Sequence, residues 1–258
     1  MLSLIRMFED DPSARRWSRR GWARVTIATV AVVYAAGFVW AVEVGQLARS
    51  HDRYAAYWSE PRGQPGGLLY VALGDSAAQS IGASRPERGY VGLVAARLAA
   101  ASGKPVQVVN LSRSGAHVRD VLREQIPLLA GMAPDLVTVD VGGNDILHTD
   151  PAELGRLVTA LVAALPVGAV VADIPYFMHG RWQREAAASS AMLREEAHGR
   201  GLPVAEVHQA MRAEGFRSMF RHYAADWFHL NDAGHQVWAD AFWSALTSSE
   251  PLRRRLLS

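Results

Sequence analysis

A serine at the end of an apolar run and an Asp-x-x-His pair late in the sequence are candidates for nucleophilic catalysis. The apolar run 69–73 leads into a Gly-Asp-Ser corner that ends at Ser76, as expected of a buried strand that presents one hydroxyl at a sheet edge. Late in the chain, Asp226 precedes His229 by three residues. A carboxylate at that spacing can bond one ring nitrogen and leave the other free as a base. Ser76 is therefore a candidate nucleophile.

Two further residues could stabilise an oxyanion. Gly115 follows an apolar run that ends near residue 110, and Asn144 follows Gly142-Gly143 after another such run. Glycine permits close approach of backbone to a substrate oxygen, and asparagine offers a neutral NH₂ donor. Each of these short motifs is by itself typical of a turn or a helix cap. Together with Ser76, Asp226 and His229, these motifs supply every component of an acyl-transfer site.

Apolar runs alternate with helical patterns after residue 67, which predicts a three-layer α/β/α fold with a five-stranded parallel sheet. Right-handed crossovers would bring the carboxyl ends of all strands to one edge, where such sheets build their sites. The expected strands span 68–73, 105–110, 135–141, 168–174 and 203–207. The expected helices span about 88–101, 116–130, 151–164, 181–199 and 232–247.

In order, these motifs resemble the SGNH, or GDSL, family of serine esterases and lipases across residues 69–239. The four letters of the name fall on Ser76, Gly115, Asn144 and His229. The resemblance implies a flavodoxin-like SGNH fold and a carboxylic ester hydrolase that needs no cofactor or metal. It also implies that Ser76 is the nucleophile, His229 the base and Asp226 its orienting carboxylate. The backbone N–H groups of Ser76 and Gly115, with the Asn144 amide, would form the oxyanion hole.

The N-terminal region carries a membrane signal. Residues 1–24 are polar and carry Arg15, Arg16, Arg19, Arg20 and Arg24, and residues 25–42 are uncharged and apolar. As a helix, the apolar run would rise about 27 Å, just enough to cross a hydrocarbon core. Trp22 and Trp40 lie where an aromatic belt would be, and the arginines favour a cytoplasmic N-terminus.

We therefore expect a basic cytoplasmic segment 1–24, a transmembrane signal anchor 25–42, a linker 43–67 and an extracytoplasmic hydrolase domain 68–258. The linker is expected because Pro61 to Gly67 is rich in helix-breaking residues. A cleaved signal peptide that releases a secreted domain is the alternative, although the apolar run exceeds the usual 7–15 residues.

The composition narrows the chemistry. The chain of 258 residues has a formal net charge of +2 and no cysteine, so thiolate nucleophiles, disulfides and cysteine-ligated zinc are excluded. The arginines gather towards the two ends, and a nucleic-acid partner is not indicated. His222, His229 and His235 could be imagined as a metal set, but their spacing fits no familiar zinc site. We expect the remaining histidines to lie on the surface or in loops: His51, His117, His148, His179, His198 and His208.

The substrate is less clearly indicated. Tyr90, Phe177 and Trp182 are candidate substrate-binding residues, because aromatics near the expected edge could form an acyl wall or simply pack a loop. Lysophospholipids, other acyl lipids and acetylated glycans are all compatible ester substrates. The same triad could instead transfer an acyl group to a glycan, and a glycan-binding module without catalysis is a third possibility.

Overall fold

The computed structural model describes residues 19–178, 180–215 and 217–258, without the side chains of residues 19–23 and 219. Arg15, Arg16 and His179 lie outside the described residues, as do the side chains of Arg19, Arg20 and Trp22. The chain divides into two compact units, Met1–Val44 and Gly45–Ser258.

The first helix, α1 (Arg19–Trp58), is long and apolar. An 18-residue window within residues 24–58 has a mean hydropathy of 2.1, and none of that window is buried in the structure. Exposed apolar side chains such as Ile27, Tyr34 and Phe38 cover this part of the helix. By length and composition, the helix could cross a membrane or serve as a signal sequence.

The second unit is built on a six-stranded sheet with the order β1-β3-β2-β4-β5-β6. Its strands are β1 (Arg62–Gly63), β2 (Leu68–Gly74), β3 (Val106–Asn110), β4 (Leu136–Asp140), β5 (Val170–Ala172) and β6 (Val204–Ala205). The last five pair in parallel in the flavodoxin-like order, which confirms the expected fold class. The two-residue β1 adds an antiparallel edge that the five-stranded prediction lacks.

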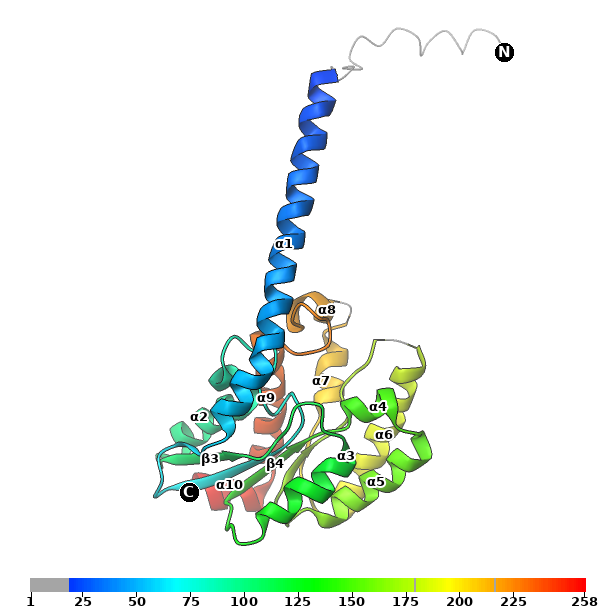
Figure 1. Ribbon diagram of the computed structural model, residues 1–258. Coiled ribbons are helices and arrows are strands. Elements are labelled where there is room, and N and C mark those ends of the chain that lie inside the picture. Colours follow the sequence, from blue (N-terminus) through cyan, green and yellow to red (C-terminus); the bar gives the residue numbers. More distant parts are fainter. Residues whose placement is uncertain (1–18, 179, 216) are drawn as a thin grey trace, which may run out of the picture. The chain divides into compact units, whose positions relative to one another are not determined.

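Helices cover both faces of the sheet, as Figure 1 shows. One face carries α2 (Tyr90–Ser102), α9 (Asp232–Ser248) and α10 (Glu250–Leu257), and the other carries α5 (Pro151–Ala164) and α6 (Gly180–Gly199). Strand β2 serves both cores, because Tyr70 and Ala72 pack on the first face while Val71 and Leu73 pack on the second. This alternation holds the strand between two apolar layers and places its carboxyl end at a defined edge.

The expected helix 116–130 is three shorter pieces in succession. These are α3 (Val118–Asp120), the π-helix η3 (Val121–Gln125) and the 3₁₀ helix η4 (Ile126–Leu129). Pro127 lies in the last of them, and its missing N–H prevents a regular α-helix through this position. Further short helices lie in expected loops: η2 (Pro86–Arg88), α4 (Gly143–His148), α7 (Val207–Ala213) and α8 (Arg217–His222).

Residues 45–58 differ from the linker expected over 43–67. They form the last part of α1 and belong to the second unit. Tyr54 and Trp58 are buried there, and the Tyr54 hydroxyl donates to the carbonyl oxygen of Ala83 at 2.7 Å. Helix-breaking composition begins only at Pro61, and burial of two aromatic side chains stabilises the helix before that point.

Candidate active site

Ser76 lies on the turn that follows β2, at the carboxyl edge of the sheet. The turn depends on Gly74, whose φ of +141° is rarely available to other residues. A Cβ at Gly74 would come within 2.1 Å of the Asp140 carbonyl oxygen. The side chain of Gln125 fixes the same glycine, since its amide accepts from the Gly74 N–H at 2.7 Å and donates to its carbonyl at 2.8 Å.

His229 and Asp226 lie on the loop between α8 and α9. Nδ1 of His229 is 2.6 Å from Oδ2 of Asp226, while Oδ1 of Asp226 accepts from the backbone N–H groups of Phe228 and His229. Partial burial alone would raise the pKa of Asp226, but its hydrogen bond with His229 and the charge of that ring lower the pKa overall. Asp226 is therefore a charged partner that orients the imidazole.

The loop that carries His229 packs closely on the turn that carries Ser76. Gly82 lies at the contact, where a Cβ would be 2.3 Å from the Leu230 carbonyl oxygen and 3.0 Å from Cβ of His229. Asp232 strengthens the contact by accepting hydrogen bonds from the backbone and hydroxyl of Ser84 at 2.7 and 2.8 Å. These bonds link two segments that are far apart in the sequence.

Asn144 and Gly115, which are expected to donate to the oxyanion together with the N–H of Ser76, lie in different places relative to the cavity. Asn144 lies in the first turn of α4, and its Nδ2 donates to the Ala116 carbonyl oxygen at 3.0 Å and to Asp75 at 3.4 Å. Gly115 has a φ of +78° and is exposed, outside the lining described for the cavity beside Ser76. The bond to Ala116 connects Asn144 to the residue that follows Gly115.

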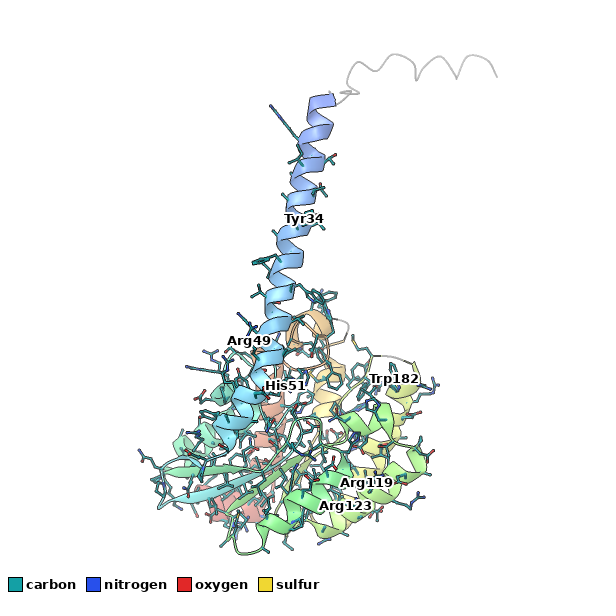
Figure 2. All side chains as sticks on the ribbon, in the orientation of Figure 1. Tyr34, Arg49, His51, Arg119, Arg123 and Trp182 are labelled. Carbon is teal, nitrogen blue, oxygen red and sulfur yellow. The ribbon has the colours of Figure 1, made fainter. Side chains whose placement is uncertain are left out.

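A cavity of about 270 Å³ contains Ser76, Asn144 and His229 in its lining. Most of the other lining side chains are apolar, among them Leu147, Pro175, Met178, Trp227 and Trp238. Phe177 and Trp182 also line it, and Figure 2 labels Trp182 near the start of α6. Tyr90 does not lie in this lining, because its ring is fully buried and stacks on Phe242 at 4.6 Å in the core.

Two buried carboxyl groups, Asp75 and Asp140, lie near Ser76. Asp75 accepts from the Ala77 N–H at 3.0 Å, and Asp140 accepts from Nε1 of Trp238 at 2.7 Å. Burial raises the pKa of Asp75 well above its ordinary value, and the charge of Asp140 raises it further. Burial also raises the pKa of Asp140 to about 7. Asp75 thus bonds its own turn and Asn144, whereas Asp226 is the carboxylate that bonds His229.

Two of the histidines expected on the surface or in loops are fully or partly buried in helices. His208 is buried, and its Nδ1 donates to the Ile174 carbonyl oxygen at 2.9 Å. His51 is half-buried, and its ring centroid lies 5.4 Å from that of His229. Neither contact has a local sequence signature, since each partner lies far along the chain. Among the described residues, no three His, Cys, Asp or Glu side chains form a group that could hold a metal ion.

A parallel α/β sheet with a serine and a histidine lining one cavity beside its carboxyl edge is typical of an ester hydrolase. The chain belongs to the GDSL-like lipase/acylhydrolase family, whose sequence profile matches residues 72–237. This membership confirms the resemblance drawn from the sequence motifs and the class of carboxylic ester hydrolase.

Solved structures of similar proteins cover the same part of the chain. LAE5, an α/β hydrolase enzyme from the metagenome of Lake Arreo in Spain, is 26% identical with a TM-score of 0.58, covering 70% of this chain and 95% of its own. TesA is also 26% identical, with a TM-score of 0.59 and coverage of 72% and 99%. A variant of Axe2, an acetyl xylan esterase from Geobacillus stearothermophilus, shares the fold at 23% identity, a TM-score of 0.59 and coverage of 70% and 94%. None of the proteins with curated descriptions matches this sequence significantly.

Proposed function

We propose that the protein is a membrane-anchored serine esterase in which Ser76 is the nucleophile and His229 the general base. The observation that carries this proposal is the cavity that both residues line, together with the 2.6 Å contact that orients His229 through Asp226. With Nδ1 bound to a carboxylate, Nε2 is the nitrogen left to accept the serine proton.

The reaction has two steps. The hydroxyl oxygen of Ser76 attacks the ester carbonyl while His229 takes its proton, and His229 then returns the proton to the leaving alcohol. Water then gives a proton to His229 and attacks the acyl-enzyme carbonyl, and His229 passes this proton to the Ser76 oxygen as its bond to the acyl group breaks and the acid is released. The backbone N–H groups of Ser76 and Gly115 and the amide of Asn144 stabilise each tetrahedral oxyanion.

The lining of the cavity favours an acyl chain over an acetyl group on a sugar. Leu147, Phe177, Met178 and Trp182 present apolar surface next to Ser76, whereas a glycan site needs polar groups to bond hydroxyls. An acyl lipid, such as a lysophospholipid, is therefore the proposed substrate class. The sugar specificity of acetyl xylan esterases belongs to proteins that share only the fold with this chain.

The anchor proposal is supported by the exposed apolar side chains of α1 and its window hydropathy of 2.1. Arginines before the apolar run favour a cytoplasmic N-terminus and an extracytoplasmic esterase. The full chain with a C-terminal tag should stay in the membrane fraction after an alkaline wash, at full-length mass. A shorter chain in the soluble fraction would show instead that α1 is a cleaved signal peptide.

A fluorophosphonate probe tests the nucleophile. The full-length wild type should be labelled on the peptide that contains Ser76, and Ser76→Ala should not be labelled. Ser244→Ala changes an exposed serine of α9 and should be labelled like the wild type. Lack of labelling in the wild type would favour a binding module without catalysis, and a label on another serine would refute the assignment.

A further inference from the structure

His51 connects the domain-side end of α1 to both halves of the candidate site. Its Nδ1 and the hydroxyl of Ser114 share a hydrogen bond of 2.8 Å. Its ring also meets the ring of His229 edge to face, with centroids 5.4 Å apart and an angle of 82° between the planes. Figure 2 labels His51 at this end of α1.

The helix end around His51 is held in place by two other side chains. The hydroxyl of Tyr54 donates to the Ala83 carbonyl oxygen at 2.7 Å, and Nε1 of Trp58 donates to the Gln79 carbonyl oxygen at 3.3 Å. Both acceptors belong to the segment that follows Ser76. Because Tyr54 and Trp58 are buried, the helix end is a fixed support for His51.

Ser114 is the residue before Gly115, whose N–H is a proposed oxyanion donor. The backbone N–H of Ser114 donates to Oε1 of Gln79 at 3.0 Å, and its hydroxyl bonds His51. Gln79 also donates to the Ser112 carbonyl oxygen at 3.0 Å. These bonds fix the backbone on either side of Ser114 and so limit movement of the Gly115 N–H. This matters because a small displacement of a donor strongly reduces transition-state stabilisation.

The ring of His229 is enclosed by its neighbours. Phe228 meets it edge to face at 5.1 Å, His51 meets it at 5.4 Å, and Asp226 bonds Nδ1. Burial lowers the pKa of His51, and the charge of His229 lowers it further, against the opposing charges of Asp226 and Asp52. A neutral His51 does not repel the positive charge that His229 carries during the reaction.

We infer that His51 is a positioning residue of this esterase, which aligns the Ser114–Gly115 backbone and the His229 ring. The last turns of α1 are thereby part of the active site as well as the continuation of its apolar part. The inference rests on the proposed roles of Ser76, Gly115 and His229. Since His51 acts through other residues, it affects kcat more than KM.

Three substitutions separate the two contacts. His51→Leu removes both, His51→Asn retains an amide near the position of Nδ1 for Ser114, and His51→Phe retains a ring beside His229. Each is made in the full-length protein in detergent, and kcat, KM and Tm are measured with a p-nitrophenyl ester. His198→Leu is the matched control, because His198 is exposed at the end of α6.

His51→Leu should lower kcat roughly tenfold or more while KM stays within about twofold, given the usual effect of a lost hydrogen bond and misaligned groups. His51→Asn and His51→Phe should each recover part of the loss. Ser114→Ala should lower kcat in the wild type and have little further effect in His51→Phe, because both changes remove one hydrogen bond.

An active wild type whose kcat is unchanged in His51→Leu would overturn the inference and leave the proposed function intact. A loss that appears only in Tm, or that neither His51→Asn nor His51→Phe recovers, would also overturn it. A wild type without esterase activity would refute the proposed function itself, and the role of His51 with it.

Discussion

Nδ1 of His229 lies 2.6 Å from Oδ2 of Asp226, on a loop that also supplies two backbone N–H donors to the same carboxylate. The carboxylate therefore has bonds to three donors within four residues. This arrangement fixes the ring independently of the substrate and directs its other nitrogen away from Asp226.

Asp226→Asn should lower kcat about 100-fold or more, because a neutral amide neither selects the required tautomer nor stabilises the imidazolium. The measurement is steady-state hydrolysis of a p-nitrophenyl ester. Asp240→Asn, on the exposed face of α9, is the matched control and should retain full activity. A fully active Asp226→Asn enzyme would assign the orienting role to another group.

Asn144→Asp should lower kcat about 100-fold or more with a smaller change in KM, since loss of one oxyanion donor has an effect of this size in other hydrolases. The substitution keeps the side-chain size but replaces the NH₂ donor with an acceptor. Because Asn144 also bonds Ala116, Tm is measured alongside to detect a loss of fold. If kcat changed less than about threefold, Asn144 would have no role in the oxyanion hole.

Activity should rise with acyl length from acetyl through butyryl to octanoyl esters. Each methylene that enters the apolar cavity contributes about 0.8 kcal/mol, or roughly a fourfold increase in kcat/KM. Trp182→Ala should reduce kcat/KM for the octanoyl ester roughly tenfold and leave the acetyl ester nearly unchanged, which provides an internal control. Preference for acetyl esters would instead support a glycan substrate.

Asp140 makes the stability of the protein depend on pH. Its pKa rises on folding from 3.8 to about 7, chiefly because it is buried. The folded state therefore binds the proton more tightly, and this stabilisation is lost as the pH rises between those two values.

Asp140→Asn mimics the protonated side chain and can still accept from Trp238. We expect its Tm to exceed that of the wild type by about 2 °C or more at about pH 8, with a smaller difference at about pH 5. Glu195→Gln, at an exposed position of α6, is the control. A difference between variant and wild type that does not change with pH would show that Asp140 does not titrate in this way.

The sequence predicts the sheet well because five apolar runs are separated by helical patterns and glycine-rich corners. The expected strand 68–73 corresponds to Leu68–Gly74, and the expected helix 151–164 to Pro151–Ala164. Local patterns do not predict the two-residue β1 or the π-helical turn at 121–125, since tertiary packing determines both.

The sequence predicts part of the candidate site for the same reason. Ser76, Asn144 and His229 are adjacent to glycine-rich or polar corners in the sequence, and one cavity brings them together. The expected position of Tyr90 at the substrate is wrong, because a sequence does not distinguish an aromatic residue of the core from one that lines a pocket. The sequence predicts a surface or loop position for His51, because its contact with His229 joins α1 to a loop near the other end of the chain and has no local pattern.

Hydrolysis of a p-nitrophenyl acyl ester by purified Ser76→Ala is the most direct test of the whole account. The wild type and the exposed-serine control Ser244→Ala should hydrolyse the ester at equal rates. Ser76→Ala should fold with the same Tm and lose at least about 1,000-fold in kcat, since the oxygen that would carry the acyl group is removed. Hydrolysis by Ser76→Ala at the wild-type rate would contradict the assignment of Ser76 as the nucleophile.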